Sequence, residues 1–455
     1  MSTLTGEEHS TILESETALG GYFRQFSKDP RKMCVGLEAE FFAVSKSTGK
    51  AVPYAGEGGV HDVLREMAAQ AGYKPVVEGF YVIGLKKGDV AVALEPGGQV
   101  ELSAPPVPDI FSIERQLRDF LADLRRASAR FEDLRWLAVG IQPFSRLEEV
   151  PWVPKKRYEL MSEYFSAHGT MSHRMMKLTA TNQVNLDYSG EEQAMERLRT
   201  AFGITSIASA MFANSSFFSG KPSGFMSERL CIWNHTDPAR TGLLTAFTRA
   251  GRTFGDYLDY ILDMPMIFII RDGFWIPMRE KTFRRFIREG HEGWSATLGD
   301  FELHLSTAFP EVRFKQYLEV RGMDCQSPYL IPAVAAFWKG ILYDDEASKQ
   351  AWELVAYADE DARSRLHRDV PRMGLKAALG GRPILPMARE LVEISRGGLR
   401  RQNRDRQMPD ETVFLDRIEE KILRPGKSPA EVLLEDWAGR LKKNPGRLIE
   451  YLSVG

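Results

Sequence analysis

The stretch V-G-L-E-A-E-F-F, from Val35 to Phe42, has the two-residue alternation of a β-strand. Successive side chains of a strand point to opposite faces, so Glu38 and Glu40 share one face and an apolar row lies on the other. A single Glu-x-Glu pair on a strand that faces water is ordinary, because antiparallel sheets often have one solvated face. A functional role for the pair therefore requires other charged side chains to converge on it.

Three further segments carry polar rows of this kind. The stretch A-L-E-P-G-G-Q-V-E-L-S places Glu95 and Glu101 around a Pro-Gly-Gly turn, and ordinary turn chemistry explains the turn but not a glutamate at both ends. The stretches R-F-K-Q-Y-L-E-V-R and T-A-T-N-Q-V-N-L-D-Y each alternate polar with apolar residues. Their polar rows are Arg313, Lys315, Tyr317, Glu319 and Arg321, and Thr179, Thr181, Gln183, Asn185 and Asp187. We expect each row to lie along one strand face.

The four rows are either separate solvated strand faces or the lining of one concave surface. In the second case five glutamates would share a confined space, and burying unpaired carboxylates is costly. Arg313 and Arg321 would offset part of the charge. Glu and Gln oxygens without a Cys or His cluster are typical ligands of Mg²⁺ or Mn²⁺ rather than of zinc. Several such ions in one site usually hold a nucleoside triphosphate during γ-phosphate transfer.

The sequence lacks the loops with which many nucleotide-binding folds hold phosphate. It contains no G-x-x-x-x-G-K-[ST] and no G-x-G-x-x-G that opens a helix after a strand. The hydrolase signatures G-x-S-x-G and H-E-x-x-H are also absent. Metal ions and arginines would therefore have to hold the phosphates.

The composition is that of an ordinary folded protein. The 455 residues include 60 basic and 62 acidic side chains, so no net charge points to nucleic acid or to a membrane surface. No apolar run approaches the ~18 residues of a membrane span, and the N-terminus lacks the pattern of a signal peptide. The three cysteines, Cys34, Cys231 and Cys325, are far apart in the sequence. We therefore expect a reduced, cytoplasmic setting.

Short alternating runs are interleaved with long helical stretches, without regular βαβ spacing. Strands are expected at 81–85, 90–94, 100–103, 178–188, 266–271 and 313–321. Helices are expected at 9–28, up to Gly72, at 113–131 and 192–213, and over most of 332–452. This arrangement favours an α+β fold over a doubly wound sheet.

Taken together, the segments resemble the glutamate–cysteine ligases of the plant and proteobacterial type, within the carboxylate–amine ligases. The matching stretches run in order from about residue 34 to 395: G-L-E-A-E-F-F, L-E-P-G-G-Q-V-E-L-S, K-K-R-Y-E-L-M, Q-V-N-L-D-Y, F-A-N-S-S-F-F-S-G-K-P-S-G-F, I-W-N-H-T-D-P-A-R-T-G, F-P-E-V-R-F-K-Q-Y-L-E-V-R-G-M-D and F-W-K-G-I-L-Y-D. The resemblance implies a glutamine-synthetase-like, funnel-shaped antiparallel β-sheet wrapped by helices. It also implies one ligase catalytic domain over residues 33–455, helical in its C-terminal part, after an N-terminal helical extension at 1–32.

Carried over position by position, the resemblance assigns roles to individual residues. Arg157 and Arg229 match positions that hold the carboxylates of substrate glutamate, a task that suits the arginine fork. Ile267 stands near the expected acceptor site, where plant relatives commonly have tyrosine. The implied metal ligands are Glu38, Glu40, Glu95, Glu101, Gln183 and Glu319, and the implied ATP ligands are Asn185, Arg313 and Arg321. Arg321 and Glu319 are expected closest to the chemistry, although the arginines could instead only form salt bridges to the glutamates.

The implied reaction is ATP-dependent ligation of L-glutamate, through γ-glutamyl phosphate, to the amine of L-cysteine, with two or three Mg²⁺ ions and Mn²⁺ as an alternative. Three other functions remain open at this point: a γ-glutamyl ligase with a different amine acceptor, a metal-dependent phosphohydrolase, and a catalytically silent binding protein. The sequence leaves the oligomeric state open, including a homodimer. It also leaves open feedback inhibition and the strictness for cysteine.

Overall fold

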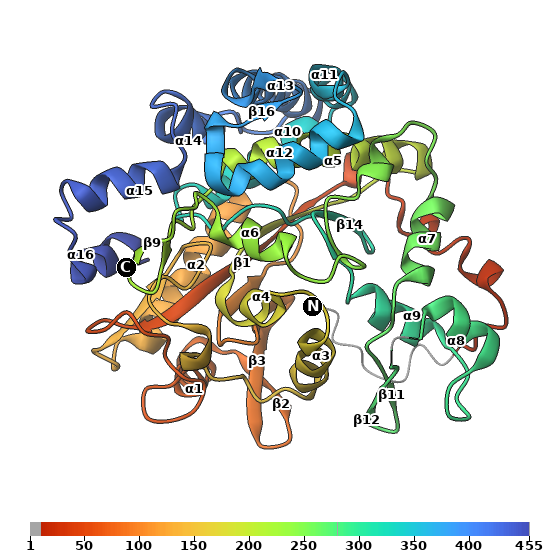
Figure 1. Ribbon diagram of the computed structural model, residues 1–455, viewed down its shortest axis with the longest axis horizontal. Coiled ribbons are helices and arrows are strands. Elements are labelled where there is room, and N and C mark those ends of the chain that lie inside the picture. The colour runs from red at the N-terminus through yellow and green to blue at the C-terminus, as the bar shows by residue number, and fades with distance from the viewer. Residues whose placement is uncertain (1–10, 280, 455) are drawn as a thin grey trace.

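A nine-stranded antiparallel β-sheet forms the centre of the chain that the structure describes, a computed structural model of residues 11–279 and 281–454. The strand order is β14-β15-β7-β1-β5-β4-β3-β2, and β6 pairs with β1. The strands are β1 (Val35–Ser45), β2 (Lys74–Glu78), β3 (Tyr81–Lys87), β4 (Val90–Leu94), β5 (Val100–Ser103), β6 (Leu134–Leu137), β7 (Asn182–Leu186), β14 (Val312–Phe314) and β15 (Leu318–Val320). The long β1 pairs with β5, β6 and β7 and crosses the middle of the molecule (Figure 1).

The two faces of β1 differ as the alternation predicts. Val35, Leu37, Ala39 and Phe41 are at most 1% exposed. They lie on the side of the sheet that contacts α2 (Ile110–Ser128) and α10 (Ile331–Leu342), and Phe41 meets Phe120 of α2 with ring centroids 6.1 Å apart. Each such buried apolar side chain contributes roughly 1.5–3 kcal/mol to folding. The polar row is thereby directed to the opposite face.

Helices surround the sheet, so the expected α+β fold is confirmed. In Figure 1, α10 to α13 gather at one end and the hairpin of β11 and β12 lies at the other. The remaining helices are α1 (Val60–Ala71), α3 (Lys156–Ser166), α4 (Ser172–Leu178), α5 (Glu191–Met211), α6 (Glu228–Asn234), α7 (Phe254–Asp263), α8 (Phe283–Glu289), α9 (Leu298–Leu305), α11 (Asp345–Val355), α12 (Glu360–Met373), α13 (Ile384–Arg406), α14 (Val413–Ile418), α15 (Pro429–Ala438) and α16 (Pro445–Leu452).

Short two-stranded ladders complete the described chain. They pair β8 (Phe217–Phe218) with β9 (Lys221–Pro222), β10 (Thr241–Gly242) with β13 (Phe309–Pro310), β11 (Phe268–Arg271) with β12 (Phe274–Pro277), and β16 (Ala378–Leu379) with β17 (Arg382–Pro383).

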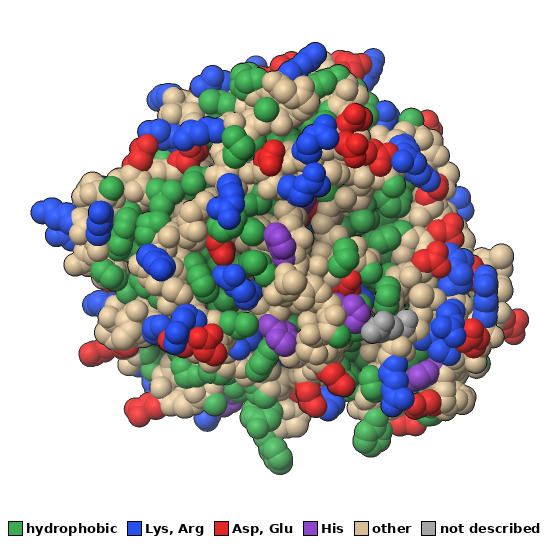
Figure 2. Space-filling model, in the orientation of Figure 1, with side chains coloured by type: hydrophobic (Ala, Val, Ile, Leu, Met, Phe, Trp, Pro, Cys, Tyr) green, Lys and Arg blue, Asp and Glu red, His purple; other side chains and the backbone are tan. Residues whose placement is uncertain are grey.

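Among residues 11–279 and 281–454, no helix combines the length and the apolar character that a membrane span needs. Basic and acidic side chains are interspersed over the face in Figure 2.

The helix predicted at 9–28 does not form over the described residues from 11 onward. The segment contains short 3₁₀ helices instead, at Glu16–Leu19 and Arg24–Phe26. Tyr22 and Phe23 pack into the core, with ring centroids 4.9 Å from Phe301 and 5.6 Å from Tyr257. Glycine weakens a helix by about 1 kcal/mol relative to alanine, and Gly20-Gly21 precedes these aromatic residues. Residues 9 and 10 lie outside the described chain.

Two predicted strands also differ from the structure. The strand expected at 313–321 is a hairpin of β14 and β15, in which Lys315 donates its backbone N–H to the carbonyl of Tyr317 at 2.9 Å. The polar alternation continues through the turn, so the sequence pattern did not reveal the reversal. The strand expected at 178–188 is shorter, because Leu178 ends α4 and β7 begins at Asn182.

Candidate active site

The register of the sheet brings the four polar rows together. Cα partners across the ladders are Glu40 with Glu101, Glu38 with Gln183, and Glu319 with Asn185. Residues that oppose each other in an antiparallel pair share a face, with Cβ atoms about 4.5–5.5 Å apart. The polar residues of β1, β5, β7 and β15 therefore form one continuous surface.

This surface lines a cavity of about 580 Å³. Its other walls come from α3, α4, α6, α9 and the hairpin of β11 and β12. The expected site residues that line the cavity are Glu38, Glu40, Glu95, Glu101, Arg157, Gln183, Arg229, Arg313 and Arg321. Asn185, Glu319 and Ile267 are not part of the lining.

Glu95 reaches the cavity from a tight turn after β4. Its N–H donates to the carbonyl of Gln99 at 2.9 Å, and the N–H of Gly98 donates to its carbonyl at 2.9 Å. A Cβ on Gly97 would lie 2.2 Å from the carbonyl oxygen of Lys177, so only glycine fits there. The Pro-Gly-Gly turn thus lets α4 approach closely and fixes the backbone that carries Glu95.

The centre of the cavity has an excess of negative charge. Burial, followed by repulsion from Glu38 and Glu95, raises the pKa of Glu101 to about 8. Burial and repulsion from Glu95 and Glu101 likewise hold the pKa of Glu40 well above its usual range, although Arg229 offsets part of this effect. Carboxylates that repel one another in a buried site cannot all ionise without a compensating cation.

These carboxylates fit a divalent cation in donor chemistry and in charge. Their oxygens are hard ligands of the kind that Mg²⁺ and Mn²⁺ take, and a cation would relieve the repulsion that raises the two pKa values. Within the described residues, however, no three His, Cys, Asp or Glu side chains already converge on a common point as a metal set.

The other side of the cavity has an excess of positive charge. Glu319, which is fully buried, pairs with Arg313, Lys315 and Arg321. Burial alone would raise the pKa of Glu319, but the three cations together hold it well below its usual range. Arg321 also donates to Oε1 of Gln183, and Asn185 donates to Oε1 of Glu38 at 3.1 Å. The sequence had left open whether the arginines form salt bridges to the glutamates, and they do.

Arg157 and Arg229 approach the cavity from the helices α3 and α6. Arg229 of α6 donates Nη1 to the carbonyl of Gly322 at 3.2 Å and Nη2 to that of Arg321 at 3.0 Å, while its Nε has no hydrogen-bond partner among the described residues. Arg157 of α3 donates Nη2 to Oγ of Ser306 at 3.1 Å. Burial lowers the pKa of both guanidiniums. Buried forks of this kind are suited to carboxylate ligands.

Ile267 does not stand at the cavity, contrary to expectation. It is 4% exposed and belongs to the hydrophobic core. Its neighbours in the same hairpin, Ile270 and Trp275, line the cavity instead. The difference from plant relatives at position 267 pointed to the hairpin that lines the cavity. It could not show which side chains of that hairpin face the cavity, because this depends on the residue at which the strand starts.

Several residues that line the cavity were not predicted from the sequence. Tyr158 donates its hydroxyl to the carbonyl of Leu94 at 2.6 Å and lies 3.5 Å from Oε1 of Glu95, so it supports the Glu95 turn. Tyr22 of the N-terminal segment donates to Oε1 of Glu302 at 3.3 Å, and both line the cavity. The K-R-Y motif was the only available signal for Tyr158. No sequence signal pointed to Tyr22.

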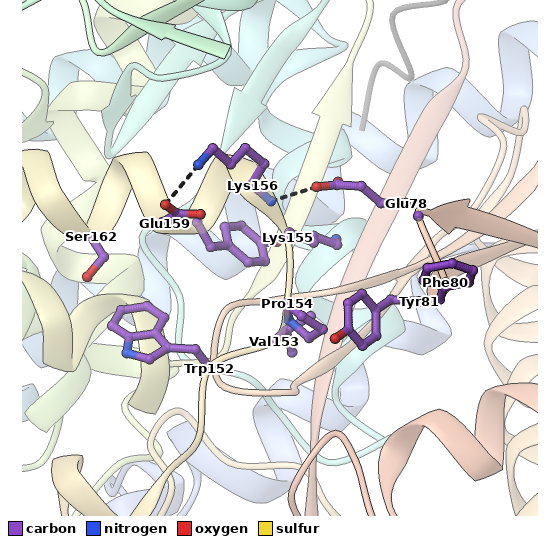
Figure 3. A pocket seen from close by; sticks show the side chains of 12 residues that line it. Glu78, Phe80, Tyr81, Trp152, Val153, Pro154, Lys155, Lys156, Glu159 and Ser162 are labelled. Carbon is purple, nitrogen blue, oxygen red and sulfur yellow. Dashed lines mark hydrogen bonds and ion pairs between the residues drawn. The ribbon is translucent and has the colours of Figure 1, made fainter. Parts of the chain in front are cut away.

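A second groove of about 640 Å³ opens beside the cavity and shares Glu78, Lys155 and Tyr158 with it. Figure 3 shows Trp152 and Tyr81 in this groove together with Lys156. Lys156 donates its backbone N–H to Glu78 at 2.7 Å and its Nζ to Glu159 at 2.8 Å (Figure 3). Its charged groups thus pair with one another, and the carboxylate and arginine sets lie in the neighbouring cavity.

The chain is similar to known proteins over most of its length. The glutamate-cysteine ligase family 2 model matches residues 34–446. Chloroplastic glutamate–cysteine ligases of Arabidopsis thaliana and Solanum lycopersicum are 35% and 34% identical to the chain, over 95% of it and over 81% and 82% of their own lengths. The crystal structure of glutamate–cysteine ligase from Francisella tularensis in complex with AMP has a TM-score of 0.58 at 12% identity, covering 92% of this chain and 88% of that one.

The comparisons correct one expectation and establish the family. The relatives are named as chloroplastic enzymes, which overturns the prediction of a cytoplasmic location. That prediction rested on dispersed cysteines, and free cysteines indicate only a reducing compartment. Since the family model covers most of the chain and relatives more than 30% identical span it, the chain belongs to the glutamate–cysteine ligase family 2.

Proposed function

We propose that the chain joins the γ-carboxylate of L-glutamate to the amine of L-cysteine and converts ATP to ADP and phosphate, giving γ-glutamylcysteine, the first step of glutathione biosynthesis. The observation that carries this proposal is the division of one cavity into a cluster of carboxylates and a cluster of cations. The first suits divalent metals and the second suits phosphate. Both are needed for ATP-dependent activation of a carboxylate.

Glu38, Glu40, Glu95 and Glu101, with Gln183 and Glu319 at the boundary, would hold Mg²⁺ or Mn²⁺. When bound, these ions neutralise the charge of the β- and γ-phosphates. The repulsion that raises the pKa of Glu40 and Glu101 supports this role. The position of this metal site would follow from the sheet register, which determines which carboxylates face each other.

Arg157 and Arg229 would bind the carboxylates of glutamate and orient its γ-carboxylate toward the phosphates. Arg313 and Arg321 line the same cavity and would act on ATP, together with Asn185, which donates to Glu38 and is not itself part of the lining. The acceptor amino acid would lie near Ile270 and Trp275, whose apolar surfaces suit a small side chain. Exclusion of water by these walls protects an acyl phosphate from hydrolysis.

The chain would act as one catalytic domain over residues 33–455, with residues 1–32 as an extension of it. Tyr22 and Phe23 support this arrangement, because they pack against α7 and α9. Tyr22 also lines the cavity. The extension would thus complete a wall of the site.

The test is to measure ADP release with glutamate alone, then with cysteine, and then with a panel of other amines, with products identified by mass. We expect rapid, glutamate-dependent ADP formation with cysteine and a γ-glutamylcysteine product. ADP release that needs no glutamate would indicate a phosphohydrolase. A γ-glutamyl product formed only with another amine would retain the ligase reaction and reject cysteine as the acceptor.

A further inference from the structure

The turn between β14 and β15 places a lysine at the cationic side of the cavity that the roles above do not use. Lys315, Gln316 and Tyr317 form this turn, and all three line the cavity. Lys315 is one of the three cations that pair with Glu319. The three cations differ in how firmly the protein already holds them.

Arg313 is held on two sides. Its Nε donates to Oε2 of Glu319 and its Nη1 donates to the carbonyl of Ala308. Its guanidinium lies over the ring of Phe309, 5.7 Å from the centroid, and its side chain is 5% exposed. These contacts fix Arg313 as a support for Glu319.

Arg321 is held in a similar way. Its Nη1 donates to Gln183 and, at 2.7 Å, to Oε2 of Glu319. The guanidinium lies between the rings of Trp233 and Phe309, at 5.9 and 5.6 Å from their centroids. Its position is therefore determined before any substrate binds.

Lys315 is held less firmly, although its Nζ also lies over a ring, that of Tyr317, at 5.8 Å from the centroid. Its Nζ lies 3.0 Å from Oε1 of Glu319, yet that oxygen accepts no hydrogen bond within the described residues. The side chain is 19% exposed, more than those of Arg313 and Arg321. An ammonium group has three donors, and here they are directed at an ion-pair partner and at the cavity rather than into a fixed hydrogen-bond network.

The charge balance supports an anionic ligand at this place. Three cations surround one carboxylate, and Glu38 is the further acidic group that acts on Lys315. A triphosphate brings several negative charges. A partly exposed ammonium on a flexible stem can follow these charges as they move, which a guanidinium fixed by two acceptors cannot do.

We propose that Lys315 is a further catalytic residue, which contacts the γ-phosphoryl group of ATP beside Arg313 and Arg321, whose side chains also hold Glu319. This inference rests on the proposed ligase function. In the step concerned, an oxygen of the glutamate γ-carboxylate forms a bond to the γ-phosphorus, and the bond from that phosphorus to the bridging oxygen breaks. The electron pair leaves with ADP. Lys315 stabilises the negative charge on the transferring group without itself gaining or losing a proton.

The test compares Lys315→Gln with Lys315→Arg and with Lys349→Gln, a control that removes a lysine charge on α11, outside the cavity, where the side chain is 68% exposed. Equilibrium dialysis in the presence of Mg²⁺ measures the binding of ATP and of AMP, and steady-state kinetics measures kcat and the KM for glutamate. Lys315→Gln should lower kcat by about 10²-fold, the scale of losing one charge-stabilising donor. It should weaken ATP binding about 10-fold and leave AMP binding and the KM for glutamate within about 2-fold, because AMP lacks the γ-phosphate. Lys315→Arg should restore part of kcat, and Lys349→Gln should resemble the unsubstituted protein.

Each other outcome is decisive. If Lys315→Gln matches Lys349→Gln in kcat and in ATP binding, Lys315 does not contact phosphate. If ATP and AMP binding weaken equally, the residue acts on the nucleoside or on the fold, and the proposal is also wrong. If the unsubstituted protein shows no glutamate-dependent ADP release, the ligase function fails, while the ratio of ATP to AMP affinity still tests the phosphate contact of Lys315.

Discussion

Glu101 and Glu319 are the same residue type on the same face of one sheet, yet their surroundings give them opposite properties. Burial and acidic neighbours raise the pKa of Glu101 to about 8, whereas three cations hold the pKa of Glu319 well below its usual range. Sites that must bind both metal and phosphate need this separation, because each ligand requires the opposite charge. The separation arises from the residues on the neighbouring strands.

Glu101→Gln is expected to change stability and activity in opposite directions. Glutamine keeps the shape and can still accept the hydrogen bond that Ser103 donates at 2.7 Å, but it removes one of the repelling charges. The melting temperature at pH 8 without Mg²⁺ should therefore rise, as at other sites where function requires strain. The apparent Mg²⁺ affinity should fall at least about 10-fold, and ligation should fall with it. A variant with unchanged Mg²⁺ dependence would show that Glu101 is not a metal ligand.

Arg229→Ala should raise the KM for glutamate far more than the KM for ATP. The buried guanidinium is held by two carbonyls, and within the described residues its Nε has no hydrogen-bond partner, so it can receive a carboxylate. A residue that contacts one substrate alters the binding of that substrate alone. Arg229→Lys keeps the charge but loses the planar fork, so its KM for glutamate should lie between those of the unsubstituted protein and of Arg229→Ala. Equal increases in both KM values would assign Arg229 to phosphate instead.

At the scale of elements, the sequence predicted strands and helices best where a local signal marks both ends. β4 and β5 match the expected ranges because turn residues flank short alternating runs. The helix expected to end at Gly72 does so, since Gly72 adopts a left-handed φ of 73° that ends α1. The hairpin of β14 and β15 was missed because its turn residues continue the alternation.

The contact between Lys339 and Glu411 joins elements that are far apart in sequence. Nζ of Lys339, on α10, donates to both carboxylate oxygens of Glu411 at 2.8 and 2.7 Å, and the N–H of Ile110, at the start of α2, donates to Oε1 at 2.6 Å. Both side chains are at most 1% exposed. Glu411 thus ties the two helices that cover the apolar face of the sheet.

Glu411→Ala should lower the free energy of unfolding by about 3–5 kcal/mol, because it leaves a buried ammonium without its partner. The double substitution Lys339→Met with Glu411→Leu should be less destabilising than the single one, since it removes both charges. Urea denaturation followed by circular dichroism measures both effects. A loss of under about 1 kcal/mol for Glu411→Ala would mean that water reaches Lys339 and replaces the pair.

At the scale of the whole molecule, the sequence indicated which residue types belong to the site. It did not indicate which of them form the carboxylate side of the cavity and which form the cationic side. Glu38, Glu40 and Glu101 could be placed from strand alternation alone. The register that pairs them, the support of Glu95 by Tyr158 and the approach of Tyr22 depend on contacts between distant segments. Ile267 failed as a cavity residue for the same reason.

The combined charge of the cavity should make the stability of the whole protein depend on pH and on Mg²⁺. The pKa of Glu101 is raised from 4.5 to about 8 in the folded state, and that of Glu40 is also raised well above 4.5. The folded state therefore binds more protons than the unfolded chain through this range, and the free energy of unfolding falls as the pH rises from about 4.5 toward 8. Mg²⁺ competes with these protons, so its stabilising effect should be largest at the upper end of the range.

We expect the melting temperature without Mg²⁺ to fall between pH 5 and pH 8, within the interval over which Glu101 would lose its proton. Saturating Mg²⁺ should restore stability at pH 8, by about 2.7 kcal/mol at a hundred times its Kd, and much less at pH 5, where protonated carboxylates bind metal poorly. Differential scanning calorimetry with and without a chelator measures both effects. Added K⁺ keeps the ionic strength equal in the samples without Mg²⁺, and the buffers contain no Ca²⁺. Glu101→Gln should flatten the pH dependence because it removes one titrating group. Equal stabilisation by Mg²⁺ at both pH values would show that the ion binds outside this carboxylate cluster.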